Sequence, residues 1–250
     1  MRTLGIDLAS QPNRTAMATL EWSATGAVVC DVQTVVSDAD ILAAAPGADK
    51  VGIDAPFGWP DAFVDVVSAH HIGDVPHEQS LFTDAGVTRF VARRTDEWVR
   101  ATTGLIPLSV SADRIAYVAL RAIRLLAHLD GPDFDTGRVN GTAVEAYPAA
   151  ALKIWGFRHK RYKGRPQQVT LAELVGELEI QAPWLDFGSA RTVCTTSDDA
   201  FDAVITALIA RAAALNLTVL PDAEHAAIAQ REGWIHIPGA PLDALVAQLS

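Results

Sequence analysis

Apolar runs that end in an acid are the clearest feature in the pattern of hydrophobic and polar positions. In the segment 50–60, a short apolar run ends at Asp54, and Pro56 cannot continue a strand because it has no backbone N–H. The same Gly-Ile-Asp sequence closes with Asp7 in the apolar segment 3–9. If the two strands are neighbours, the two carboxylates lie within about one strand spacing, ~4.8 Å. Such a pair requires a raised pKa or a bound cation.

The remaining pattern predicts an α/β protein with a mixed sheet. Short turns join the predicted strands 3–9, 15–22 and 27–36 into an antiparallel meander. A helix at 39–45 then lets the strand 51–54 return parallel to the first. Further helices are predicted at 61–71, 95–102, 112–129, 149–155, 170–178, 198–215, 223–231 and 241–249, and further strands at 143–147, 191–194 and 234–237.

No linker or repeat interrupts the chain, so we predict one domain over residues 1–250. Residues 60–130 are predicted to form a helical insertion that caps the sheet, and residues 223–250 a C-terminal extension. Half of the 250 residues are hydrophobic, which is enough for a sizeable core.

Charge and cysteine content limit the functional classes. The formal net charge of −10 argues against coating nucleic acid through a general positive field, but it is compatible with a local basic groove. The two cysteines have no metal-ligand spacing and indicate a reducing compartment. An acid interrupts the first apolar run after three residues and no apolar stretch of about 18 residues follows, so we expect no signal peptide and a soluble, cytoplasmic protein.

Five acids are the candidates for chemistry: Asp7, Asp54, Glu145, Asp199 and Asp202. Asp199 and Asp202 are three residues apart and share a helix face, although Asp199 also fits a helix cap. Asp202 lies in an apolar stretch, where an unpaired acid is costly. Mg²⁺ and Mn²⁺ prefer oxygen ligands, and two such ions hold both the attacking and the leaving oxygen of a phosphodiester.

Basic residues form a second candidate group. Lys160, Lys163 and Arg165 belong to a positive, aromatic-containing loop that can dock a polyanion or a nucleotide phosphate, or can simply be a solvated surface loop. Arg94 can bind a phosphate through two hydrogen bonds or pair with Asp96.

Several motifs together carry a resemblance to a known family. They are Gly5-Ile6-Asp7-Leu8-Ala9, Gly52-Ile53-Asp54-Ala55-Pro56, Arg94-Thr95-Asp96, Glu145-Ala146-Tyr147-Pro148, Tyr162-Lys163-Gly164-Arg165, Asp199-Ala200-Phe201-Asp202-Ala203 and Glu232-Gly233-Trp234-Ile235. Over nearly its whole length the chain resembles the DUF429 family, described as predicted ribonuclease H-like nucleases.

The resemblance implies a ribonuclease H-like fold, in the arrangement of the Holliday-junction resolvases. It also implies that Asp7, Asp54 and Asp202 bind Mg²⁺ or Mn²⁺, that Glu145 and Asp199 belong to the same cluster, and that Arg94 is functional. Asp54 departs from the glutamate often found on the second strand of resolvase-like sites, so its reach to a metal is shorter.

Three functional hypotheses follow. The first is a metal-dependent nuclease or phosphodiesterase acting on a nucleic acid or a nucleotide. The second is an actin-like phosphotransferase, but Asp7 is followed by Leu8-Ala9-Ser10-Gln11 without the glycines of a phosphate loop. The third is a non-enzymatic module that binds nucleic acid or nucleotide, for which metal binding without turnover would be the mark.

Overall fold

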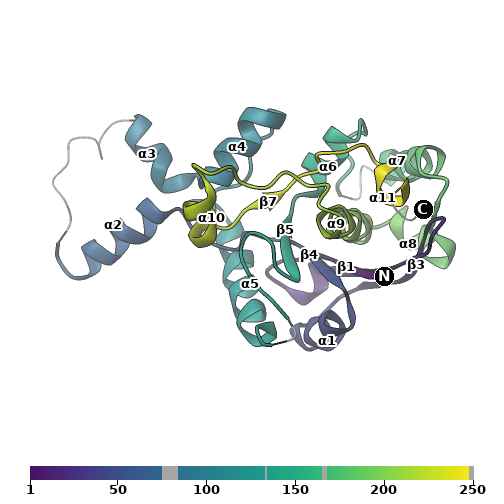
Figure 1. Cartoon of the computed structure of the whole chain (residues 1–250), viewed down its shortest axis with the longest axis horizontal. Helices are drawn as coiled ribbons and strands as arrows, with labels where there is room; N and C mark the ends of the chain where they lie inside the picture. The colour runs from purple at the N-terminus through teal and green to yellow at the C-terminus, as the bar shows by residue number, and fades with distance from the viewer. Residues whose placement is uncertain (75–83, 133, 165–167, 248–250) are drawn as a thin grey trace.

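A mixed seven-stranded sheet forms the centre of the molecule (Figure 1). The computed structural model describes residues 1–74, 84–132, 134–164 and 168–247. The strand order is β6-β3-β2-β1-β4-β5-β7, in which β1, β2 and β3 pair antiparallel and β4, β5 and β7 continue parallel to β1. The strands are β1 (Arg2–Asp7), β2 (Ala16–Trp22), β3 (Ala27–Thr34), β4 (Lys50–Asp54), β5 (Ala143–Ala146), β6 (Leu185–Asp186) and β7 (Ile235–His236).

Helices cover both faces of this sheet. Leu4, Ile6 and Ile53 on one face pack with α1 and α5, whereas Ala16 and Leu20 on the other face pack with α9 and its neighbours. The α-helices of the described residues are α1 (Asp38–Ala44), α2 (Asp61–His71), α3 (Asp84–Val91), α4 (Arg94–Thr103), α5 (Ile115–Leu129), α6 (Pro148–Ile154), α7 (Gln168–Gln181), α8 (Arg191–Cys194), α9 (Asp198–Ala214), α10 (Ala226–Glu232) and α11 (Ala244–Ala247). The predicted α/β class with a mixed sheet is therefore confirmed.

The predicted neighbourhood of β1 and β4 is also confirmed. The two strands pair parallel in the register Gly5↔Gly52 and Asp7↔Asp54. Alternation along the strands places Leu4 and Ile6 on the α1 and α5 face. Gly5 and Asp7 therefore lie on the α9 face.

The glycines of the two Gly-Ile-Asp motifs allow α9 to lie close to the sheet. A Cβ atom on Gly5 would lie 2.1 Å from the carbonyl oxygen of Ala203, and one on Gly52 would lie 2.6 Å from that of Thr206. The side chain of Ser197 caps α9 by accepting from the backbone N–H of Ala200. This close approach brings the first turns of α9 beside the ends of β1 and β4.

Helices α2 to α5 lie between β4 and β5 in the chain, and α2 and α3 extend away from the sheet (Figure 1). The C-terminal segment contributes β7 to the sheet edge beside β5. One predicted strand is wrong: residues 191–194 form the single-turn helix α8. Four residues are too few for periodicity to separate a strand from a helix.

Candidate functional site

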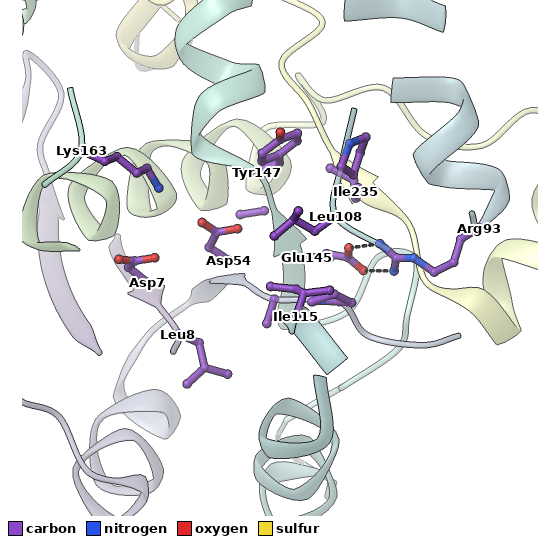
Figure 2. A pocket seen from close by; sticks show the side chains of 14 residues that line it. Asp7, Leu8, Asp54, Arg93, Leu108, Ile115, Glu145, Tyr147, Lys163 and Ile235 are labelled. Carbon is purple, nitrogen blue, oxygen red and sulfur yellow. Dashed lines mark hydrogen bonds and ion pairs between the residues drawn. The ribbon is translucent and has the colours of Figure 1, made fainter. Parts of the chain in front are cut away.

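Asp7 and Asp54 lie side by side at the carboxyl ends of β1 and β4. Both are half-buried, and both line a pocket of about 300 Å³. Figure 2 shows the two carboxylates at one end of this pocket. Among the described residues, no side chain or backbone group forms a hydrogen bond or ion pair with either carboxylate. The outer ends of parallel strands are where α/β proteins commonly bind ligands.

Asp202 from α9 adds a third carboxylate and is fully buried. The hydroxyl of Tyr162 donates to its Oδ1 at 2.8 Å, and the ammonium of Lys163 lies 2.5 Å from its Oδ2. Lys163 is half exposed and points toward Asp7 and Asp54 (Figure 2). If all three acids are ionised, one ammonium leaves two negative charges uncompensated.

The electrostatics of the cluster reflect this imbalance. Burial raises the pKa of Asp54 to about 7, with Lys163 opposing the shift and Asp202 adding to it. Burial and repulsion from Asp202 and Asp54 raise the pKa of Asp7 well above its ordinary value. Burial alone would lower the pKa of Lys163, but attraction to Asp202 raises it. The carboxylates of Asp7 and Asp54 therefore tend to bind protons or another cation.

The metal-free protein is expected to lose stability as pH rises toward 7 because of Asp54. An unfolded Asp titrates near 3.9, so between about pH 4 and 7 the folded state binds more protons than the unfolded state. We predict that Asp54→Asn is more stable than the wild type at pH 8 and that the difference shrinks at pH 5. Melting temperatures of both proteins without metal test this. An equal difference at both pH values would contradict the raised pKa.

His236 titrates in the same range, because burial lowers its pKa to about 4. Its neutral form is favoured in the folded state, so its contribution to stability is lost as pH falls from about 6.5 toward 4. The wild type and Asp54→Asn both carry His236, so this opposite effect cancels in the difference between their melting temperatures.

Glu145 is held in a different arrangement. It pairs in register with Ile53, so strand alternation starts its side chain on the face opposite Asp54. Arg93 donates from Nη2 to its Oε1 at 2.7 Å and from Nη1 to its Oε2 at 2.9 Å, and the N–H of Phe57 donates to Oε2 at 3.0 Å. Arg93 also donates to both oxygens of Asp96. Glu145 is thus neutralised in a buried ion network.

Arg93→Met is expected to cost about 3–5 kcal/mol of unfolding free energy, because it leaves two buried carboxylates without their cation. The adjacent Arg94→Met is the matched control: Arg94 is exposed, its side chain pairs with Glu97 alone among the described residues, and the substitution should cost less than about 1 kcal/mol. Urea denaturation of both variants measures the contrast. Equal costs would show that the buried network is not stabilising.

The other predicted site residues lie as follows. Asp199 pairs with Arg14, whose Nε and Nη2 donate to its two oxygens at 3.1 Å. Arg94 pairs with Glu97 at 2.8 Å, and Lys160 is exposed. Arg165 lies outside the described residues. The structure therefore brings together Asp7, Asp54, Asp202 and Lys163, and it places Glu145, Asp199 and Arg94 with partners of their own.

Sequence reasoning did not identify several residues around the pocket. Tyr162 holds Asp202, and Arg93 holds Glu145. Tyr147, Leu108 and Ile115 form pocket walls. Tyr147 and Tyr162 belong to two of the motifs that carry the family resemblance, which is the signal that points to them. Leu108 and Ile115 come from a distant segment and give no such signal.

Within the described part of the chain, no group of three or more His, Cys, Asp or Glu side chains is arranged to hold one metal ion. A metal at this site would therefore take two protein carboxylates, Asp7 and Asp54. This number suits Mg²⁺, which usually keeps several waters and binds through one or two carboxylates together with substrate phosphates. The two unpartnered carboxylates fit such an ion.

Fold and site together define an α/β protein with a carboxylate-lined pocket at the ends of its parallel strands. The chain belongs to the family described as Protein of unknown function (DUF429), which matches residues 5–226. Searches of curated proteins and of solved structures found no match. No helix among the described residues is long and apolar enough to span a membrane.

Proposed function

We propose that this protein hydrolyses phosphodiester bonds of a nucleic acid or nucleotide with the help of Mg²⁺ or Mn²⁺. The observation that carries the proposal is the pairing of Asp7 with Asp54. The two strand-end carboxylates are adjacent in register, line a pocket and have no partner among the described residues. Two ionised acids in this position cost free energy unless they bind protons or a cation, and such perturbed acids are common at functional sites.

A divalent cation would be held by Asp7 and Asp54, and bound there it would polarise a phosphoryl oxygen and activate water for attack on phosphorus. The residues of the chain supply the surroundings. Tyr162 and Lys163 fix Asp202, and the ammonium of Lys163, which points toward Asp7 and Asp54, would attract a phosphate bound there. Leu108 and Ile115 supply apolar surface to the same pocket.

The topology supports a ribonuclease H-like assignment. A three-stranded antiparallel meander, a helix, a parallel strand and a late helix with a buried acid follow one another in the order expected for that fold. Acids on the first strand, on the parallel strand and on the late helix meet at one place, as the resemblance implies. Fold alone does not establish an activity, so the proposal depends on the site.

One contact favours a second candidate, a non-enzymatic module that binds a nucleotide or nucleic acid. Lys163 already supplies Asp202 with a cation, so part of the acidic cluster is neutralised without metal. Such a site can retain phosphate binding through Lys163 without turnover.

Hydrolysis assays with Mn²⁺ and with EDTA separate the two candidates. The substrates are bis(p-nitrophenyl) phosphate, labelled RNA and labelled DNA, and the melting temperature is measured in parallel. Hydrolysis that needs Mn²⁺ supports the enzyme. A Mn²⁺-dependent rise in melting temperature with no hydrolysis of any substrate would favour the binding module.

A further inference from the structure

The pocket has two chemically different ends. Asp7, Asp54 and Lys163 form a charged end, while Leu108 and Ile115 lie on the side away from Lys163 (Figure 2). At about 300 Å³, the pocket is at the lower limit for small-molecule sites. This is room for about one nucleotide, and it is far too small for the width of a duplex.

The pocket cannot extend past the wall that Arg93 and Glu145 form. Arg93 uses all five guanidinium N–H groups, two on Glu145, two on Asp96 and one on the carbonyl oxygen of Glu232. A ligand therefore meets a closed ion network here, without a free arginine donor. Opening it would leave buried charges unpaired.

The rim next to Leu108 is unsuited to a duplex backbone. Leu108 lines the pocket and is 61 % exposed, so an apolar side chain faces solvent where duplex-binding proteins place lysine and arginine. The basic residues Lys160 and Lys163 lie on another segment, and the whole chain carries a net charge of −10. Such a rim favours a ligand that buries an apolar group.

We propose that the pocket takes one nucleotide-sized phosphoester at a time. Its phosphate lies at the Asp7 and Asp54 end, and its base or another apolar group lies against Leu108 and Ile115. This inference rests on the proposed function for the place of the phosphate. The ligand is either a free small nucleotide ester or the unpaired end of a single strand, and base pairs are excluded.

The test uses the full chain with Mn²⁺ and three substrates: thymidine 5′-(p-nitrophenyl phosphate), an end-labelled single-stranded DNA, and the same strand in a duplex. We expect the small ester to be cleaved, or the single strand to be shortened from one end, and the duplex to react at least about tenfold more slowly. Cleavage of the ester alone would show that the ligand is a free nucleotide ester. Shortening of the single strand would show that the ligand is the unpaired end of a strand.

Leu108→Glu tests the apolar wall. It is expected to weaken binding of thymidine 5′-monophosphate, measured by calorimetry with Mn²⁺, by about tenfold, and to raise KM for the ester with little change in kcat, because a carboxylate there repels the ligand. Leu120→Glu is the matched control, since Leu120 is similarly exposed at 55 % and lines a different cavity, beside Arg121. It should change neither value.

The outcomes separate the two proposals. Thymidine 5′-monophosphate binding that Leu108→Glu weakens, without cleavage of any ester, keeps the pocket assignment and overturns hydrolysis. Duplex cleavage as fast as that of the ester, or unchanged binding in Leu108→Glu, overturns the pocket assignment and leaves hydrolysis standing. Neither binding nor cleavage would overturn both.

Discussion

Asp54→Asn is expected to reduce Mn²⁺-dependent hydrolysis by about 10³-fold or more. The substitution removes one of the two carboxylates that lie side by side without a partner, and with it the charge that would hold the ion. Metal assistance is worth several kcal/mol, and each 1.36 kcal/mol is a factor of ten in rate. Asp7→Asn should have the same effect, because the two acids act on the same ion.

The same variant should be more stable than the wild type at pH 8 without metal, since it removes a carboxylate whose pKa burial raises to about 7 and which also repels Asp7. Loss of activity together with gained stability distinguishes a functional acid from a structural one. Asp31→Asn is the matched control: Asp31 is exposed on β3 of the same sheet and should change neither property. If both Asp54→Asn and Asp7→Asn retained Mn²⁺-dependent activity, these two acids would not take part in the hydrolysis.

The pairing of Asp7 with Asp54 could be predicted from sequence because each acid ends a local apolar run. A repeated Gly-Ile-Asp pattern raised the possibility that the two strands are neighbours, and an intervening helix allowed a parallel return; the structure shows the pairing and its matching register. Asp202 followed similarly, because an acid among apolar residues of a strong helix must be buried with a partner. Both inferences used patterns that are local in sequence, namely two apolar runs that end in an acid and one apolar helix.

The partners of the acids could not be predicted, because they depend on packing between distant elements. Glu145 lies on the other face from Asp54 through a one-residue difference in register, which no local pattern reveals. Arg93, rather than its neighbour Arg94, is the buried arginine. Helix α4 packs against α10 and β7, and in this packing Arg93 reaches Glu145. Arg14 and Asp199 are 185 residues apart in sequence.

The sequence patterns missed three elements. The two-residue strand β6 and the helix α3 were not predicted, and the four residues of α8 were predicted as a strand. Longer helices such as α5 and α9 were predicted with boundaries within a few residues of those in the structure. Periodicity needs several turns or several alternations before it separates the two states.

Gly5→Ala is expected to destabilise the protein by more than about 4 kcal/mol, or to prevent folding. The added Cβ would lie 2.1 Å from the carbonyl oxygen of Ala203 and 2.2 Å from the backbone nitrogen of Ala207. These are backbone atoms of α9 and cannot rotate away, so the helix must move off the sheet. Nearly every residue of α9 is buried, and such a shift opens the core, which is among the few mechanisms that give losses of this size. Urea denaturation followed by circular dichroism measures the loss.

Gly176→Ala is the matched control, because a Cβ atom on Gly176 meets nothing within 4 Å and the residue lies inside α7. It should stabilise the protein by roughly 0.5–1 kcal/mol, the usual gain from replacing a helical glycine. The contrast tests the site as well as the fold, since only a helix lying against Gly5 and Gly52 brings Asp202 beside Asp7 and Asp54. If Gly5→Ala were as stable as the wild type, α9 would have to lie farther from β1, and the three carboxylates would no longer form one cluster.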